Sequence, residues 1–143
     1  MRPILLALAC LGLAACQNTT VPSVEVSDAV CRPTPNGRDL TGCYLTLTAS
    51  TEDRLVAVST SAAAEAQIHA VSTEGGVMAM EEMPDGMPLR ANDPAELAPG
   101  GDHIMLLGVT TPLKPGDTVD LVLTFERADP ATVTAQVGTP PLS

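Results

Sequence analysis

The chain has 143 residues, with 7 basic and 17 acidic side chains and a formal net charge of −10 at pH 7. This acidic balance argues against nucleic acid and anionic lipid headgroups as partners, because both would repel the protein at long range. The sequence also has no Gly-x-Ser-x-Gly, no phosphate-binding glycine loop and no reactive-cysteine motif, so we expect a protein that is not an enzyme.

The first 15 residues are typical of a secretory signal. Arg2 precedes an apolar run over residues 4–9, which is too short to span a membrane stably. The sequence Leu-Ala-Ala-Cys then ends at Cys16 and resembles a bacterial lipobox, in which the cysteine is lipidated and becomes the new N-terminus. We therefore expect a lipoprotein anchored to a membrane in the bacterial periplasm, with a short tether over residues 16–23. The alternative is an ordinary signal cleaved nearby, which would leave Cys16 as a free thiol.

One domain is expected after the signal. Removal of residues 1–15 would leave 128 of the 143 residues, which is a natural size for a single domain. The polar tether ends near Val24, where the first strand-like run begins. We therefore place the domain at residues 24–138 and a short C-terminal tail at residues 139–143.

Cysteine usage fits an oxidising compartment. Besides Cys16, the mature chain keeps only Cys31 and Cys43, and the residues between them are rich in proline and glycine. Because this turn chemistry separates two apolar stretches, adjacent strands could bring the two cysteines together as a disulfide. A redox or metal role for the pair is the alternative, but no Cys-x-x-Cys spacing or neighbouring histidine supports it.

The domain has the pattern of an all-β protein. Short apolar runs alternate with Gly, Pro, Asp and Asn, and the run at residues 119–126 has its apolar side chains on one face. Helical periodicity is lacking, although residues 62–64 could form a single helical turn. Seven to eight strands fit a two-sheet β-sandwich or a small Greek-key barrel. The expected strands are residues 24–30, 43–49, 54–59, 66–71, 77–81, 103–109, 119–127 and 132–137.

Both histidines of the chain lie among methionines. His69 precedes Met78 and Met80 by one tight turn, and His103 stands two residues before Met105. Imidazole suits copper, and the soft thioether favours Cu(I) over the hard cations that prefer carboxylates. Because a thioether carries no proton and forms no disulfide, such a site can hold Cu(I) in an oxidising compartment.

Strand geometry would allow these residues to meet. Side chains alternate between the two faces of a strand, so His103 and Met105 share one face. The glycine-rich segment 74–76 could turn the chain so that His69 folds back beside Met80. We therefore predict a Cu(I) cage of His69, Met80, His103 and Met105. The alternative is that the methionines are core filler, their commonest role, and that the histidines are exposed by chance.

Three further methionines are candidate auxiliary ligands. They are Met78, which shares a face with Met80, and Met83 and Met87, which flank a Pro-Asp-Gly turn. For Met78 or Met80 taken alone, packing is the more common role. For Met83 and Met87, we favour a role as loop residues.

These ligands and their spacing resemble the signature of the periplasmic copper chaperones of the PCuAC type. That signature is a histidine, a methionine eleven residues later and, after roughly twenty more residues, His-x-Met; His69 and Met80 are eleven positions apart, and residues 103–105 supply the end. The similarity continues through residues 44–47, 75–78, 99–101 and 112–117.

The resemblance implies a fold, a cargo and a partner. The fold is a cupredoxin-like, Ig-like Greek-key β-sandwich, and the cargo is one Cu(I) held by His69, Met80, His103 and Met105. The partner is a copper acceptor, either cytochrome c oxidase subunit II with its dinuclear site or a Sco-type chaperone. Since the chain ends without a His/Met-rich tail, we expect one copper per chain, and we expect a monomer.

The chain departs from the family pattern at two places. Between Met80 and His103 there are 22 residues, where the signature usually has 21, and Ala70 occupies a position where many members carry another methionine. One insertion in a loop is tolerable.

Three other functions are alternatives to copper delivery. A blue-copper electron carrier needs a cysteine beside its histidines, and no cysteine follows Cys43. Copper storage or detoxification would use the same cage as delivery. A passive Ig-like surface module with incidental metal binding is the third alternative, and the clustered ligands argue against it.

Overall fold

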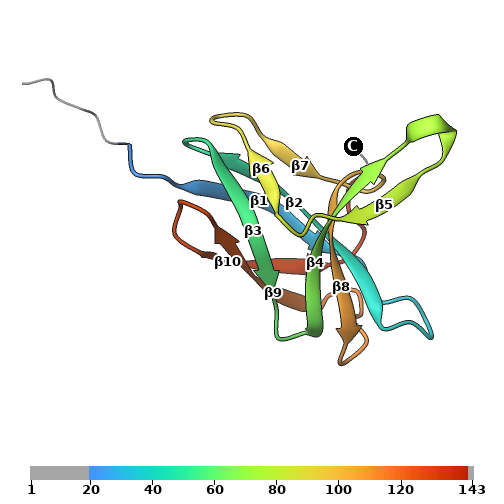
Figure 1. Cartoon of the computed structure of the whole chain (residues 1–143). Helices are drawn as coiled ribbons and strands as arrows, with labels where there is room; N and C mark the ends of the chain where they lie inside the picture. The colour runs from blue at the N-terminus through green and yellow to red at the C-terminus, as the bar shows by residue number, and fades with distance from the viewer. Residues whose placement is uncertain (1–19, 142–143) are drawn as a thin grey trace, which may run out of the picture.

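The computed structural model describes residues 20–141. The expected signal segment, the lipidation site Cys16, most of the tether and the last two residues lie outside this range. In the described part, the chain forms ten strands and one 3₁₀ turn (Figure 1). No helix within residues 20–141 has the length and apolar character needed to cross a membrane.

The prediction of an all-β sandwich is confirmed, with more strands than expected. All eight expected runs are strands, but two three-residue strands, β6 and β7, were not predicted. Residues 62–64 do not form the helical turn that the sequence allowed, since β4 already begins at Ala63 and pairs with β8 from there. The elements are β1 (Val24–Cys31), β2 (Leu40–Ala49), β3 (Asp53–Ser59), β4 (Ala63–Ser72), the 3₁₀ turn η1 (Glu74–Gly76), β5 (Ala79–Glu82), β6 (Met87–Leu89), β7 (Ala95–Leu97), β8 (His103–Val109), β9 (Thr118–Phe125) and β10 (Ala131–Val137).

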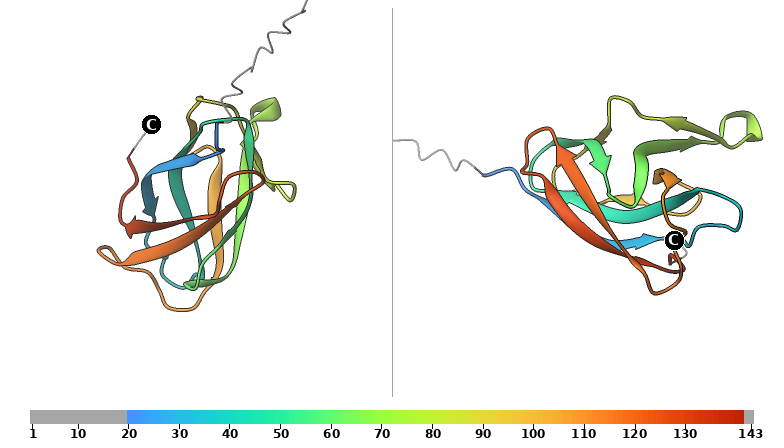
Figure 2. Two further views of the ribbon diagram at one scale, coloured as in Figure 1. Left: turned by 90° about the vertical axis from the view of Figure 1, so that its left-hand side faces the viewer. Right: turned by 90° about the horizontal axis from the view of Figure 1, so that it is seen from below.

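The strands follow one hydrogen-bonded path that folds over into two layers (Figures 1 and 2). Its order is β5-β4-β8-β2-β1-β10-β9-β3-β6, with β7 added beside β2. Strand β1 joins the layers, because it pairs with β2 in antiparallel fashion and with β10 in parallel at its end. The register of β1 against β2 shifts between Ser27 and Val30, and this bulge, which includes Asp28 with a φ of +56°, bends the strand.

The core lies between the layers and is aliphatic. Alternate residues of β2, β8 and β9 point into it, as the period-2 pattern of each strand requires. Residues Leu45, Leu47, Leu55, Ile104, Leu106, Leu121 and Leu123 are essentially inaccessible to solvent. Cys31 and Cys43 face each other on β1 and β2, are fully buried and form a disulfide.

A buried carboxylate joins β3 to the loop between β9 and β10. The backbone N–H groups of Arg54 and Arg127 donate to Asp53 Oδ1 at 2.7 and 2.9 Å, and that of Ala128 donates to Oδ2 at 2.8 Å. Burial by itself raises the pKa of Asp53, but these backbone donors outweigh it and lower the pKa below its ordinary value of 3.8. Asp53 is therefore ionised at neutral pH and accepts hydrogen bonds from three backbone N–H groups.

The disulfide should stabilise the domain measurably. Reducing it should lower the free energy of unfolding by about 2 to 3 kcal/mol, because the bond restrains a short loop in the unfolded chain. Urea denaturation with and without a phosphine reductant measures the difference. Peptide mapping by mass spectrometry without reductant should find the Cys31 and Cys43 peptides joined, and recovery of both as free thiols would contradict the assignment.

Replacing Asp53 by alanine should destabilise the fold by about 2 to 4 kcal/mol at pH 7, since three backbone N–H donors, that of Ala128 buried and the other two partly buried, would lose an ionised acceptor. The folded-state pKa is depressed, so this contribution is complete above about pH 3.8 and is lost as the pH falls toward the lowered value. Urea denaturation of the parent and the variant at pH 7 measures the loss of stability, and the same comparison in acid tests whether the loss becomes smaller. Asp129→Ala, an exposed residue of the same loop, is the control and should cost little; equal losses for the two variants would refute the assignment.

Candidate metal centre

The two histidines lie directly opposite each other on neighbouring strands. In the antiparallel ladder of β4 and β8, His69 pairs with His103, and their ring centroids are 5.5 Å apart. Met105 lies two residues further along β8 and therefore shares the face of His103. Ile68 and Ile104 point the other way, into the core. Three predicted ligands thus share the outer face of this layer.

The fourth predicted ligand comes from β5. This strand pairs with β4 so that Met80 lies opposite Val71, which puts Met80 on the same face as His69. The predicted turn at residues 74–76 is present as η1, where Gly75 and Gly76 have φ values of +65° and +78°. Both values favour glycine, so the turn that returns Met80 beside His69 depends on this pair. The β4–β5 hairpin projects beyond the rest of the sandwich (Figures 1 and 2).

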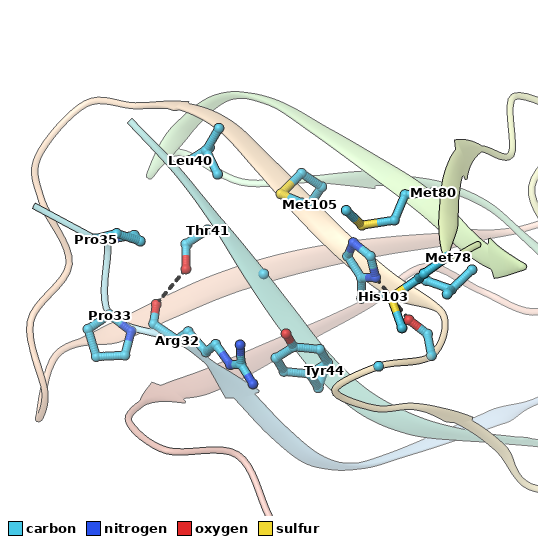
Figure 3. A pocket seen from close by; sticks show the side chains of 14 residues that line it. Arg32, Pro33, Pro35, Leu40, Thr41, Tyr44, Met78, Met80, His103 and Met105 are labelled. Carbon is cyan, nitrogen blue, oxygen red and sulfur yellow. Dashed lines mark hydrogen bonds between the residues drawn. The ribbon is translucent and has the colours of Figure 1, made fainter. Parts of the chain in front are cut away.

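A surface hollow of about 310 Å³ is lined by three of the predicted ligands, Met80, His103 and Met105, whereas His69 does not line it. His103, Met105, Met78 and Met80 converge at one side of it (Figure 3). His103 is only 6% exposed, whereas Met78 and Met80 are 61% and 59% exposed. The site therefore combines a deep imidazole with thioethers that a second molecule can reach.

Each imidazole has one nitrogen engaged and one free. His103 Nδ1 donates to the carbonyl oxygen of Gly101 at 3.0 Å, and no hydrogen bond to its Nε2 occurs within residues 20–141. His69 Nε2 bonds to Gln67 Oε1 at 2.9 Å, while its Nδ1 is buried without a hydrogen-bond partner. A buried polar atom without a partner is costly and calls for an explanation. A soft cation bound there would supply the missing partner.

Burial and a neighbouring imidazole both favour the neutral form of His69. Burial lowers the pKa of His69 below its ordinary value of 6.5, and the neighbouring His103 lowers it further, while Glu82 opposes both effects. Since only a neutral imidazole has a lone pair for a metal, the lowered pKa reduces competition from protons. Glu82 lies opposite His69 on β5 and adds a negative charge beside the site, which favours a bound cation.

Tyr44 and Arg32 also line the hollow, and sequence reasoning gave them no role. The ring of Tyr44 is 6.4 Å from that of His103, and the Arg32 guanidinium lies over the same tyrosine ring at 5.5 Å (Figure 3). A Cβ at Gly42 would lie 3.0 Å from the Tyr44 hydroxyl oxygen, so a larger residue there would push on the tyrosine ring. Tyr44 stands between the core-facing Cys43 and Leu45, and this alternation was the signal that it points outward.

The auxiliary methionines separate into two groups. Met78 lines the hollow with Met80. Met87 is buried on β6, where it pairs with Leu55, and Met83 is half-buried against the core. The backbone N–H of Met83 donates to the carbonyl of Ile68, a core-facing residue, and neither Met83 nor Met87 lines the hollow.

The β-sandwich is that of a PCuAC-type domain, as comparisons with known proteins show. The model of the LpqE-like family, "Putative lipoprotein LpqE-like", matches residues 24–137. The chain belongs to this family. A relative from Leifsonia xyli subsp. xyli, "Putative lipoprotein Lxx21020", is 35% identical over 83 residues, which are 58% of this chain and 50% of that protein. The chain thus spans about half the length of this relative.

Solved PCuAC structures share the fold. The apo PCuAC domain from PmoF1 superposes with a TM-score of 0.68 at 25% identity, covering 82% of this chain and 94% of that domain. The solution structure of Cu(I)-bound DR1885 from Deinococcus radiodurans has a TM-score of 0.60 at 28% identity, covering 87% of this chain and 80% of that protein. The resemblance to PCuAC proteins inferred from the sequence is confirmed.

Proposed function

We propose that this chain is an extracytoplasmic Cu(I) metallochaperone that holds one copper between His69, Met80, His103 and Met105 and passes it to an acceptor. The observation that carries the proposal is the cross-strand pair of His69 and His103, each with one nitrogen free of hydrogen bonds to the described residues, beside two methionines on the same face. Two imidazoles and two thioethers form a neutral, soft donor set, which suits Cu(I).

Delivery requires that copper be held and then released. Four neutral ligands leave the bound ion with its own charge, so a thiolate-bearing acceptor would gain both a covalent and an electrostatic advantage. The exposed thioether of Met80 can be displaced first, while the buried His103 still holds the metal. Ligands would then exchange one at a time, and free Cu(I) would never enter solution.

The acceptor and the location follow from family resemblance. Copper would go to the dinuclear site of cytochrome c oxidase, directly to subunit II or through a Sco-type chaperone. Membership of the LpqE-like family supports the expectation of a lipoprotein, and lipid on Cys16 would keep the protein at a periplasmic membrane surface. That the chain has no enzymatic activity, carries one copper and works as a monomer remain predictions.

The protein purified in the form that the cell makes should bind one equivalent of Cu(I) in an anaerobic competition titration. The double variant His103→Ala, Met105→Ala should lose most of this affinity, because it removes one imidazole and one thioether from the same strand. Met87→Leu is the matched control, since it replaces a buried methionine outside the site by a residue of similar volume and should leave binding unchanged.

Weak binding that is equal in the parent and in the double variant would contradict the copper-site proposal. The surface-module alternative would then be favoured.

Transfer can be tested separately from binding. When the Cu(I)-loaded protein is mixed with the metal-free soluble domain of oxidase subunit II, copper should move to that domain faster than it does from a chelator that buffers the same free Cu(I). The visible spectrum of the dinuclear centre reports arrival after oxidation. A protein that binds copper but retains it against both this domain and a Sco-type chaperone would favour storage or detoxification.

A further inference from the structure

Gln67 lies in the ligand face, and the copper proposal gives it no role. The ladder of β4 and β8 sets four side chains in a square, with Gln67 opposite Met105 and His69 opposite His103. Three corners of this square are candidate ligands. The fourth, Gln67, is half-buried, and its amide oxygen is too hard a donor for Cu(I).

The orientation of the Gln67 amide follows from its two partners. Gln67 Nε2 donates to Glu65 Oε1 at 2.8 Å, and Gln67 Oε1 lies 2.9 Å from His69 Nε2. An ionised carboxylate only accepts hydrogen bonds, so the NH₂ group must face Glu65 and the amide oxygen must face the histidine. That oxygen also only accepts. His69 Nε2 must therefore carry the ring proton, and Nδ1 must hold the free lone pair.

In His103, the ring proton lies on the other nitrogen. Its Nδ1 faces the carbonyl oxygen of Gly101, which can only accept, so Nδ1 carries the proton and Nε2 has the lone pair. The two opposed histidines thus offer different nitrogens. On His69, the free Nδ1 is also the atom that is buried without a partner.

We propose that Gln67 is a positioning residue for copper: it holds His69 in the Nε2–H form with Nδ1 toward the metal, and Glu65 keeps the amide in the required orientation. This inference rests on the proposed copper site. Without the Gln67 acceptor, the His69 ring could turn by 180° about its Cβ–Cγ bond and bring a C–H group where the lone pair is needed. Partners of this kind, which hydrogen-bond to a metal-binding histidine, typically contribute 10- to 100-fold in metal affinity.

The first test needs no metal. Long-range ¹H–¹⁵N spectra of the metal-free protein, purified in the form that the cell makes, distinguish a protonated ring nitrogen from a bare one. We expect the proton on Nε2 of His69 and on Nδ1 of His103 at a pH where both rings are neutral. On addition of Cu(I), the resonance of His69 Nδ1 should shift most on that ring. A proton on His69 Nδ1 in the metal-free protein would overturn the inference.

Three variants then separate positioning from a merely structural role. Gln67→Leu removes the acceptor and should lower Cu(I) affinity by about 10- to 100-fold, with loss of the single His69 tautomer. Gln67→Glu keeps an acceptor and should restore both the tautomer and affinity to within about threefold of the parent. Gln136→Leu, at an exposed position of β10, is the control and should change neither.

The outcomes distinguish the two proposals. If Gln67→Leu binds Cu(I) like the parent and His69 keeps its tautomer, the positioning role is refuted while the copper site stands. If the His103→Ala, Met105→Ala variant also binds like the parent, the copper site itself is refuted. Should Gln67→Leu fail to fold, the spectra of the parent protein still decide which nitrogen of His69 carries the proton.

Discussion

The register between β4 and β8 is the constraint on which the candidate site depends. A slip of one residue in either strand would turn its side chains to the opposite face and separate the two histidines. The inner face prevents this slip, because Ile68 and Ile104 face each other in the core and Ala66 faces Leu106. Burial of these apolar side chains favours the native register by several kcal/mol in total. Hydrophobic packing on one face of the layer thus positions the polar site on the other.

The site is asymmetric in depth, and this asymmetry suits a carrier better than a permanent metal centre. His103 lies beneath the hollow, walled by Tyr44, whereas Met80 stands on an edge strand reached through a double-glycine turn. An edge strand with exposed side chains belongs to the less protected part of a fold. Displacing Met80 would therefore disturb few other contacts, while displacing His103 would require opening the layer.

Much of this arrangement could be predicted from the sequence because strands obey a period of two. That rule predicted that His103 and Met105 share a face, and the glycines at 75 and 76 predicted the turn between β4 and β5. It could not give strands β6 and β7, since three residues show no periodicity and Pro88 argues against a strand. Nor could it give roles to Gln67 and Tyr44, because these follow from which strands are neighbours. Which residues pair across strands is set by the fold, and the spacing of residues along the sequence does not reveal it.

The neutrality of the donor set explains why hydrogen bonds around the histidines should matter more here than in a site built from thiolates or carboxylates. An anionic ligand attracts a cation from any direction, so small errors in its orientation cost little. An imidazole offers one lone pair along one axis, and a thioether offers only weak, directional donation. Since no charged ligand can compensate for a misdirected lone pair, the affinity for the metal depends on how well each donor atom points toward it. The acceptors at Gln67 and Gly101 aim the two rings, and the β4–β8 register brings those rings together.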